Sequence, residues 1–148
     1  MGKNILIFIL LLVILGGCSF NGDKTVDSSI PFKEGAIFST ESFLTYSVRG
    51  DYKEGKNYFL QLSVNVPAKD GNFTKKVLKG AEFKAEENTK ILSDSILVED
   101  IKDMISQNDD YDIKNLKDEW KNFDYTVDLY NMKNGNLENG SGITKKIK

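Results

Sequence analysis

The side chains that most often carry out covalent chemistry or bind transition metals are almost absent from this sequence. Its 148 residues contain one cysteine, Cys18, and no histidine. The chain therefore lacks serine–histidine and cysteine–histidine nucleophile pairs, and it has no histidine metal ligands. A single cysteine also leaves no partner for an intramolecular disulfide. We expect no cofactor, and any catalysis would have to use the 22 aspartate and glutamate side chains.

One group of acidic residues has the spacing of a calcium-binding loop. Positions 1, 3, 5 and 12 of that loop are filled by Asn108, Asp110, Asp112 and Glu119. Position 6 is Ile113, whereas the loop needs a glycine there to make its sharp turn. The favoured interpretation is an acidic loop that leads into a helix, where its charges complement the helix dipole. We therefore predict no metal site.

Paired carboxylates are the other chemistry that this composition allows. Glu99 and Asp103 are four residues apart, which places them on one face if the segment is helical. Such a pair is more often a solvated helix face than the acid and base of a hydrolase. We predict no catalytic residues and keep a carboxylate-dependent hydrolase as an alternative.

Two further features are candidates for binding. Arg49, Gly50 and Asp51 form the tripeptide that integrin ligands display on exposed turns, although Gly-Asp is also common in hairpin loops. Trp120 could line a groove for an apolar ligand or a partner helix, although a tryptophan at helical spacing more often belongs to the core. These four residues are the candidate binding residues of the chain.

The amino terminus combines a positive charge with a short apolar run. Lys3 precedes eleven consecutive apolar residues, from Ile5 to Leu15. As a helix this run would be about 17 Å long, little more than half of the roughly 30 Å hydrocarbon core of a membrane. It is too short for a transmembrane helix and has the length of the apolar region of a signal peptide.

The four residues Leu15, Gly16, Gly17 and Cys18 complete this segment. It resembles the signal peptide of bacterial lipoproteins, whose pattern is leucine, a small or polar residue, glycine or alanine, and then cysteine. The resemblance implies diacylglyceryl transfer to the Cys18 sulfur and cleavage between Gly17 and Cys18. Two acyl chains on one residue satisfy the two-signal requirement for stable anchoring. We expect a lipid-anchored protein on the extracytoplasmic face of a bacterial cell membrane.

Composition indicates how the rest of the chain is divided. Residues 1–17 are the predicted signal peptide, and the polar residues 18–29 are a predicted flexible tether with Cys18 at its start. Residues 30–148 are predicted to form a single domain. After loss of Lys3, 19 lysine and arginine residues face 22 acidic residues, so the net charge is −3. This balance disfavours a nucleic-acid partner and attraction to an anionic membrane surface.

Alternation with a period of two predicts strands in the first half of the domain. One strand is predicted over residues 43–48 and a second over residues 58–66, where Pro67 ends it. The residues expected on their buried faces are Leu44, Tyr46, Val48, Tyr58, Leu60, Leu62, Val64 and Val66. Because a turn-rich segment separates the two runs, we predict that they form a hairpin. A further strand is predicted at residues 37–38, and one or two more are predicted over residues 73–78 and 81–85.

The second half changes to a helical period. One helix is predicted from Leu97, Ile101, Met104 and Ile105, with Ser93 or Ser95 as its N-cap. Another is predicted from Ile113, Leu116, Trp120 and Phe123, with Asp112 as its N-cap. Residues 125–129 then alternate again, and Asn134-Gly135 favours a two-residue hairpin turn. The tail from about residue 134 is either an edge strand or disordered.

These elements predict an α+β fold, with a small antiparallel sheet or partly open barrel covered on one side by about two short helices. Residues 58–66, the Asp70-Gly71 turn and Leu78–Ala81 resemble small extracytoplasmic barrels of Gram-positive bacteria, which implies the same fold. The predicted function is binding of an envelope protein or a small ligand. A hydrolase, or an exclusion or immunity lipoprotein of a phage or plasmid, are the alternatives.

Overall fold

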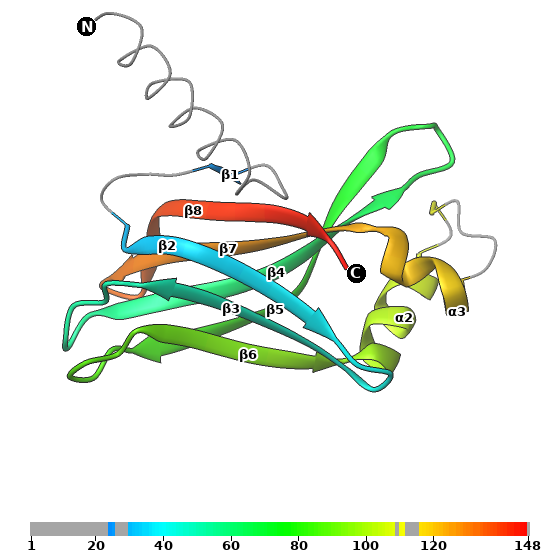
Figure 1. The fold of residues 1–148 in the computed structure, drawn as a ribbon. Coiled ribbons are helices and arrows are strands. Elements are labelled where there is room, and N and C mark those ends of the chain that lie inside the picture. Colours follow the sequence, from blue (N-terminus) through cyan, green and yellow to red (C-terminus); the bar gives the residue numbers. More distant parts are fainter. Residues whose placement is uncertain (1–23, 26–29, 109, 112–115, 148) are drawn as a thin grey trace, which may run out of the picture.

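Two antiparallel β-sheets make up most of the protein (Figure 1). The computed structural model describes residues 24–25, 30–108, 110–111 and 116–147. The strands are β1 (Lys24–Thr25), β2 (Phe32–Ser39), β3 (Phe43–Gly50), β4 (Asn57–Pro67), β5 (Phe73–Lys84), β6 (Ile91–Leu97), β7 (Asp124–Lys133) and β8 (Asn136–Lys146). The helical segments are α2 (Val98–Ser106), the single turn α3 (Leu116–Glu119) and the 3-10 turn η1 (Trp120–Asn122). The fold is mostly β, with one helix longer than a single turn among the described residues.

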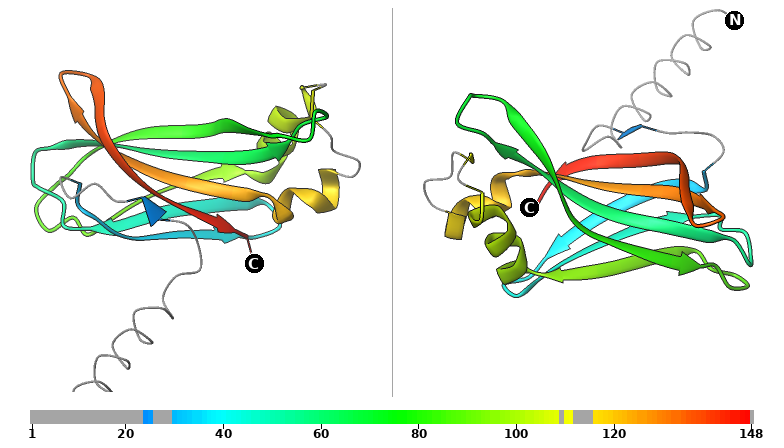
Figure 2. Two further views of the ribbon diagram at one scale, coloured as in Figure 1. Left: turned by 90° about the horizontal axis from the view of Figure 1, so that it is seen from above. Right: turned by 180° about the vertical axis from the view of Figure 1, so that it is seen from behind.

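The two sheets lie face to face (Figure 2). The larger sheet has the strand order β1-β8-β7-β4-β5, and the smaller has the order β2-β3-β6. Helix α2 and the turn α3 lie together at one end of the sheets, and the tip of the β4–β5 hairpin extends beyond the sheets at the same end (Figures 1 and 2). One hydrophobic core fills the space between the sheets.

The alternating runs have the buried faces that were predicted. Leu44, Tyr46 and Val48 of β3 are fully buried, and so are the alternate residues of β4 from Tyr58 to Val66. In β7 the buried apolar side chains are Tyr125, Val127 and Leu129. Because side chains alternate between the faces of a strand, each of these strands places every second residue in the core.

The predicted hairpin between residues 43–48 and 58–66 is wrong. Strand β3 pairs with β2 and β6, whereas β4 pairs with β5 and β7. The segment between β3 and β4 therefore carries the chain from one sheet to the other. Tyr52 in this segment contacts both sheets. Its hydroxyl donates to the Val48 carbonyl of β3 at 2.7 Å, and its ring lies 5.0 Å from the Tyr58 ring of β4.

Helix α2 begins later than the predicted caps require. Ser93 and Ser95 lie within β6, where the Ser95 and Thr45 hydroxyls are hydrogen-bonded at 2.7 Å. The N-cap residue is Leu97, in extended conformation and without a capping hydrogen bond from its side chain. The serine caps were wrong because both hydroxyls are used within the smaller sheet, and β6 continues directly into the helix.

The second predicted helix is reduced to a single turn in the described residues. Its Asp112 cap and Ile113 lie outside them. After α3 and η1 the backbone becomes extended at Phe123, with φ −74° and ψ 158°. The Tyr125 hydroxyl donates to the Trp120 carbonyl at 2.7 Å. This buried bond holds the first residue of η1 against β7.

The carboxyl-terminal tail is a strand. Asn134 and Gly135 have φ values of +52° and +78°, as a type I′ hairpin turn requires, so the predicted turn is confirmed. Strand β8 pairs with β7 along its length and with β1 at Ile143 and Gly142. It is therefore an inner strand, because Lys24 and Thr25 form the edge. Residues 24–25 thus belong to the sheet, whereas the sequence predicted a flexible tether there.

Candidate functional site

The candidate binding residues near the end of β3 are tied to their neighbours. Arg49 forms an ion pair with Glu34 at 3.8 Å, and Gly50 is buried in the sheet. The Asp51 carboxylate pairs with Lys33 and, at 3.6 Å, with Lys90. The hydrogen bond from the Lys33 ammonium is the main cause that lowers the pKa of Asp51. Adhesion through this tripeptide stays a prediction, but two of its three residues lie in a regular strand instead of at the tip of a turn.

Trp120 lies in the core and is only 3% exposed. The Lys121 ammonium lies over the indole ring, 5.5 Å from its centre. The indole belongs to the same buried cluster as Phe123 and Tyr125. Its position agrees with the core interpretation.

The described part of the calcium-like loop contains Asn108, Asp110 and Glu119, whereas Asp112 lies outside it. The Asn108 side-chain oxygen accepts the Asp110 backbone N–H at 3.0 Å, which forms a local turn. Among the described residues there is no group of three acidic, histidine or cysteine side chains that could hold a metal. The predicted lipidation and cleavage residues, Gly17 and Cys18, also lie outside the described residues.

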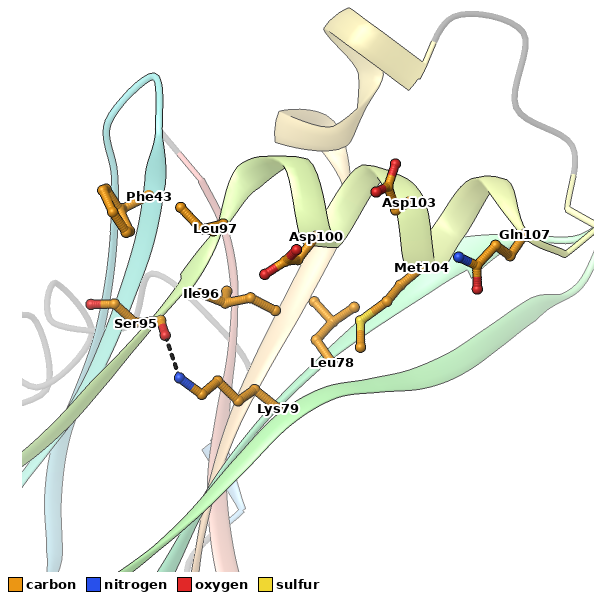
Figure 3. A pocket seen from close by; sticks show the side chains of 10 residues that line it. All are labelled: Phe43, Leu78, Lys79, Ser95, Ile96, Leu97, Asp100, Asp103, Met104 and Gln107. Carbon is orange, nitrogen blue, oxygen red and sulfur yellow. Dashed lines mark hydrogen bonds between the residues drawn. The ribbon is translucent and has the colours of Figure 1, made fainter.

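A groove of about 670 Å³ lies between the two sheets and α2 (Figure 3). Strand β5 contributes Leu78 and Lys79, and β3 contributes Phe43. The remaining lining residues come from β6 and α2: Ser95, Ile96, Leu97, Asp100, Asp103, Met104 and Gln107. We call this hollow the β5–β6 groove.

The floor of the β5–β6 groove is apolar. Leu78 and Ile96 are buried there, and Met104 reaches toward Leu78 from α2 (Figure 3). At the mouth, Phe43 and Leu97 are register partners in β3 and β6 and are 48% and 43% exposed. An apolar surface that stays exposed inside a concave site is typical of a binding site.

The rim of the groove is acidic. Asp100 and Asp103 lie one turn apart on the exposed face of α2, and both line the groove. Neither forms an ion pair with another residue in the described part of the chain, whereas other aspartates do so elsewhere. A ligand with an apolar body and positive charges would therefore complement this groove.

A polar network closes the gap between the sheets beside the groove. The Lys79 ammonium donates to Asp94 at 3.1 Å and to the Ser95 carbonyl at 2.6 Å. The Tyr46 hydroxyl donates to the other Asp94 oxygen at 3.1 Å. Burial, followed by the negative charge of Asp94, raises the pKa of Tyr46 well above its usual range. Tyr46 therefore acts as a hydrogen-bond donor in this network, not as an acid.

If β5 kept the alternation of its first residues, Lys79 would point away from the core. Lys79 instead points across the gap, because β5 has a bulge opposite Leu62 and Ser63 that reverses its alternation. The adjacent apolar residues Val77 and Leu78 do not reveal this bulge, because a regular strand would also place one of them in solvent. Val77 is 52% exposed and Leu78 is buried.

No helix in the described part of the chain is long and apolar enough to cross a membrane. Comparisons with protein families, with curated proteins and with solved structures find nothing that matches this chain.

Proposed function

We propose that this protein is a bacterial surface lipoprotein that binds another envelope protein through the β5–β6 groove. The proposed attachment rests on Leu15, Gly16, Gly17 and Cys18, which follow an apolar run of the right length. A diacylglyceryl group on Cys18 would hold the protein at the extracytoplasmic face of the cell membrane. The folded part then meets partners that occupy the same surface.

The single observation that carries the binding proposal is the combination of an apolar floor with two unpaired carboxylates on its rim. Leu78 and Met104 offer dispersion contacts, while Asp100 and Asp103 offer positions for cations. The partner surface that fits is a polypeptide segment in which apolar and basic side chains occur together. The net negative charge of the mature chain favours its encounter with such a segment.

We regard the two sheets as a partly open barrel, because lysine side chains connect a strand of one sheet with a strand of the other on both sides of the core. The Lys145 ammonium of β8 donates to the Gly35 carbonyl of β2 at 2.9 Å, and Lys79 of β5 reaches β6. A gap bridged by side chains alone can admit a ligand, whereas a continuous ladder of backbone hydrogen bonds cannot.

A binding assay tests the proposal. The full-length lipidated protein in phosphatidylcholine nanodiscs is titrated with a fluorescent, acetylated and amidated heptapeptide in which leucine and lysine alternate. Empty nanodiscs and a peptide with glutamate in place of lysine are the controls. We expect saturable binding that weakens at high salt, because the carboxylates of the rim are exposed.

A pair of matched variants locates the binding site. Asp100→Asn combined with Asp103→Asn removes two charges from the rim, and we expect an affinity about three- to tenfold lower. Glu87→Gln combined with Glu99→Gln removes the same charge from exposed positions outside the groove. Equal affinity in both double variants would refute the groove as the binding site.

A further inference from the structure

Strand β6 presents an unpaired backbone edge to the β5–β6 groove. Within the described residues it pairs only with β3, and it is the last strand of the smaller sheet. Beyond the two ends of the β3–β6 ladder, the Gly50 N–H donates to the Lys90 carbonyl at 3.0 Å and the Val98 N–H donates to the Ser42 carbonyl at 2.9 Å. Bonded positions alternate in an antiparallel ladder, so the even-numbered residues of β6 face β3.

The backbone groups of the odd-numbered residues therefore face the gap between the sheets. These residues are Ile91, Ser93, Ser95 and Leu97. They repeat at about 6.6 Å along the strand, since each residue advances about 3.3 Å. Strand β5, on the other side of the gap, is the edge of the larger sheet. Two edges without a strand partner thus face the same space.

The ammonium of Lys79, a residue of β5, lies at the middle of the β6 edge. This ammonium donates to the Ser95 carbonyl, and the Ser95 N–H donates to the Asp94 carboxylate at 2.8 Å. The backbone of Ser95 is thus satisfied by two side chains where a neighbouring strand would otherwise bond. A lysine on an edge strand is a common protection against unwanted pairing with another chain. Lys79 makes these contacts through its ammonium, so the ammonium can move away from β6 without unfolding the sheet.

We propose that the bound segment adds to β6 as an extra strand and displaces the Lys79 ammonium from the Ser95 carbonyl. This inference rests on the proposed function and specifies its mode of binding. The backbone of the segment bonds with Ser93, Ser95 and Leu97, which no small apolar amine can do along the whole edge. Its alternate side chains place apolar groups on the floor of the groove and basic groups toward the carboxylates of α2.

The test separates backbone pairing from side-chain contacts. Two versions of the leucine–lysine heptapeptide carry N-methyl groups, one on alternate amides beginning at the second residue and the other on alternate amides beginning at the third. Only one of these sets faces β6 in an added strand. We expect one version to lose affinity by at least about tenfold, because each lost hydrogen bond costs about fivefold, while the other binds like the unmodified peptide.

Hydrogen exchange gives a second readout on the protein itself. At saturating peptide, we expect the amides of Ser93 and Leu97 to exchange about tenfold more slowly, whereas the amides of β2 keep their rates. Lys79→Met removes the displaced ammonium and keeps its apolar stem, so this variant should bind the peptide more tightly. Lys75→Met, which breaks an ion pair with Asp128 outside the groove, should not change binding.

The outcomes distinguish this inference from the function on which it rests. Saturable binding that is equally insensitive to both methylation patterns, without protection of β6, would overturn strand addition and leave the groove as a binding site. Dodecylamine that competes with the peptide and binds as tightly as it does would identify a small-molecule site and would also overturn strand addition. Absence of any peptide binding would overturn the proposed function.

Discussion

Asp94 connects the two sheets at the scale of single residues. Its carboxylate accepts hydrogen bonds from Tyr46 in the core, from Lys79 on the opposite sheet and from the Ser95 backbone. Its side chain is only 22% exposed. Loss of this acceptor would leave the buried Tyr46 hydroxyl without its hydrogen-bond acceptor and the Lys79 ammonium without its ion pair, which costs more than the bonds themselves contribute.

We predict that Asp94→Ala lowers the free energy of unfolding by about 1–3 kcal/mol, since charge-assisted hydrogen bonds are lost in a partly buried site. Urea unfolding followed by circular dichroism measures this change. Asp103→Ala is the matched control, because its carboxylate has no ion pair in the described part of the chain, and its effect should stay within about 0.5 kcal/mol. Equal stability of the two variants would show that the network contributes nothing.

The lowered pKa of Asp51 predicts a pH-dependent contribution to stability. Its pKa in the folded protein lies below the ordinary value of 3.8, so the folded state favours the charged form. The stabilisation is therefore present above pH 3.8 and is lost as the pH falls through the lower folded value. We expect wild type to be more stable than Asp51→Asn at pH 7 and equally stable near about pH 2. Urea midpoints across this range measure the difference, and a constant gap would contradict the prediction.

At the scale of elements, the sequence predicted which residues each strand buries but not which strand lies beside it. Burial of Leu44 and Tyr46 requires only that one face of β3 meets the core, and any neighbouring strand satisfies that requirement. The hairpin prediction failed for this reason. The turn at Asn134-Gly135 was predictable because positive φ values are a local property.

The β5–β6 groove was not predictable from local patterns. Leu78 and Met104 each have the signature of core residues, and Asp100 that of a solvated helix face. Their proximity depends on the bulge in β5 and on the direction in which α2 leaves β6, and neither is encoded within a short window of sequence. Distant segments define the site, as is usual for binding sites between elements.

The glycines of β8 give a prediction for that element. A side chain at Gly142 would overlap with the Asp128 carboxylate, which is itself paired with Lys75 at 3.0 Å. We expect Gly142→Ala to lower the free energy of unfolding by about 1–3 kcal/mol, because the pair must shift to admit the methyl group. Thermal unfolding of a double-mutant cycle with Asp128→Ala measures the coupling, and the glycine substitution should cost less in that background. Full additivity would contradict this account.

At the scale of the whole molecule, the proposed lipid anchor predicts where the protein is found. We expect wild type to partition into detergent, with an intact mass that corresponds to residues 18–148 plus the lipid. Cys18→Ala should lack the lipid, because it has no sulfur to accept the diacylglyceryl group. Ser19→Ala is the control and should be modified like wild type. An unmodified thiol in the wild-type protein would refute the anchor.

The pairing of Lys24 and Thr25 with β8 limits how far the folded body can stand from the bilayer. Six peptide units separate Cys18 from Lys24, so this part of the tether can span at most about 20 Å when it is fully extended. If the anchor is as proposed, the body is confined to a thin layer directly above the headgroups. A partner must then present its segment within that layer, and surface polymers that crowd it would compete for the same space.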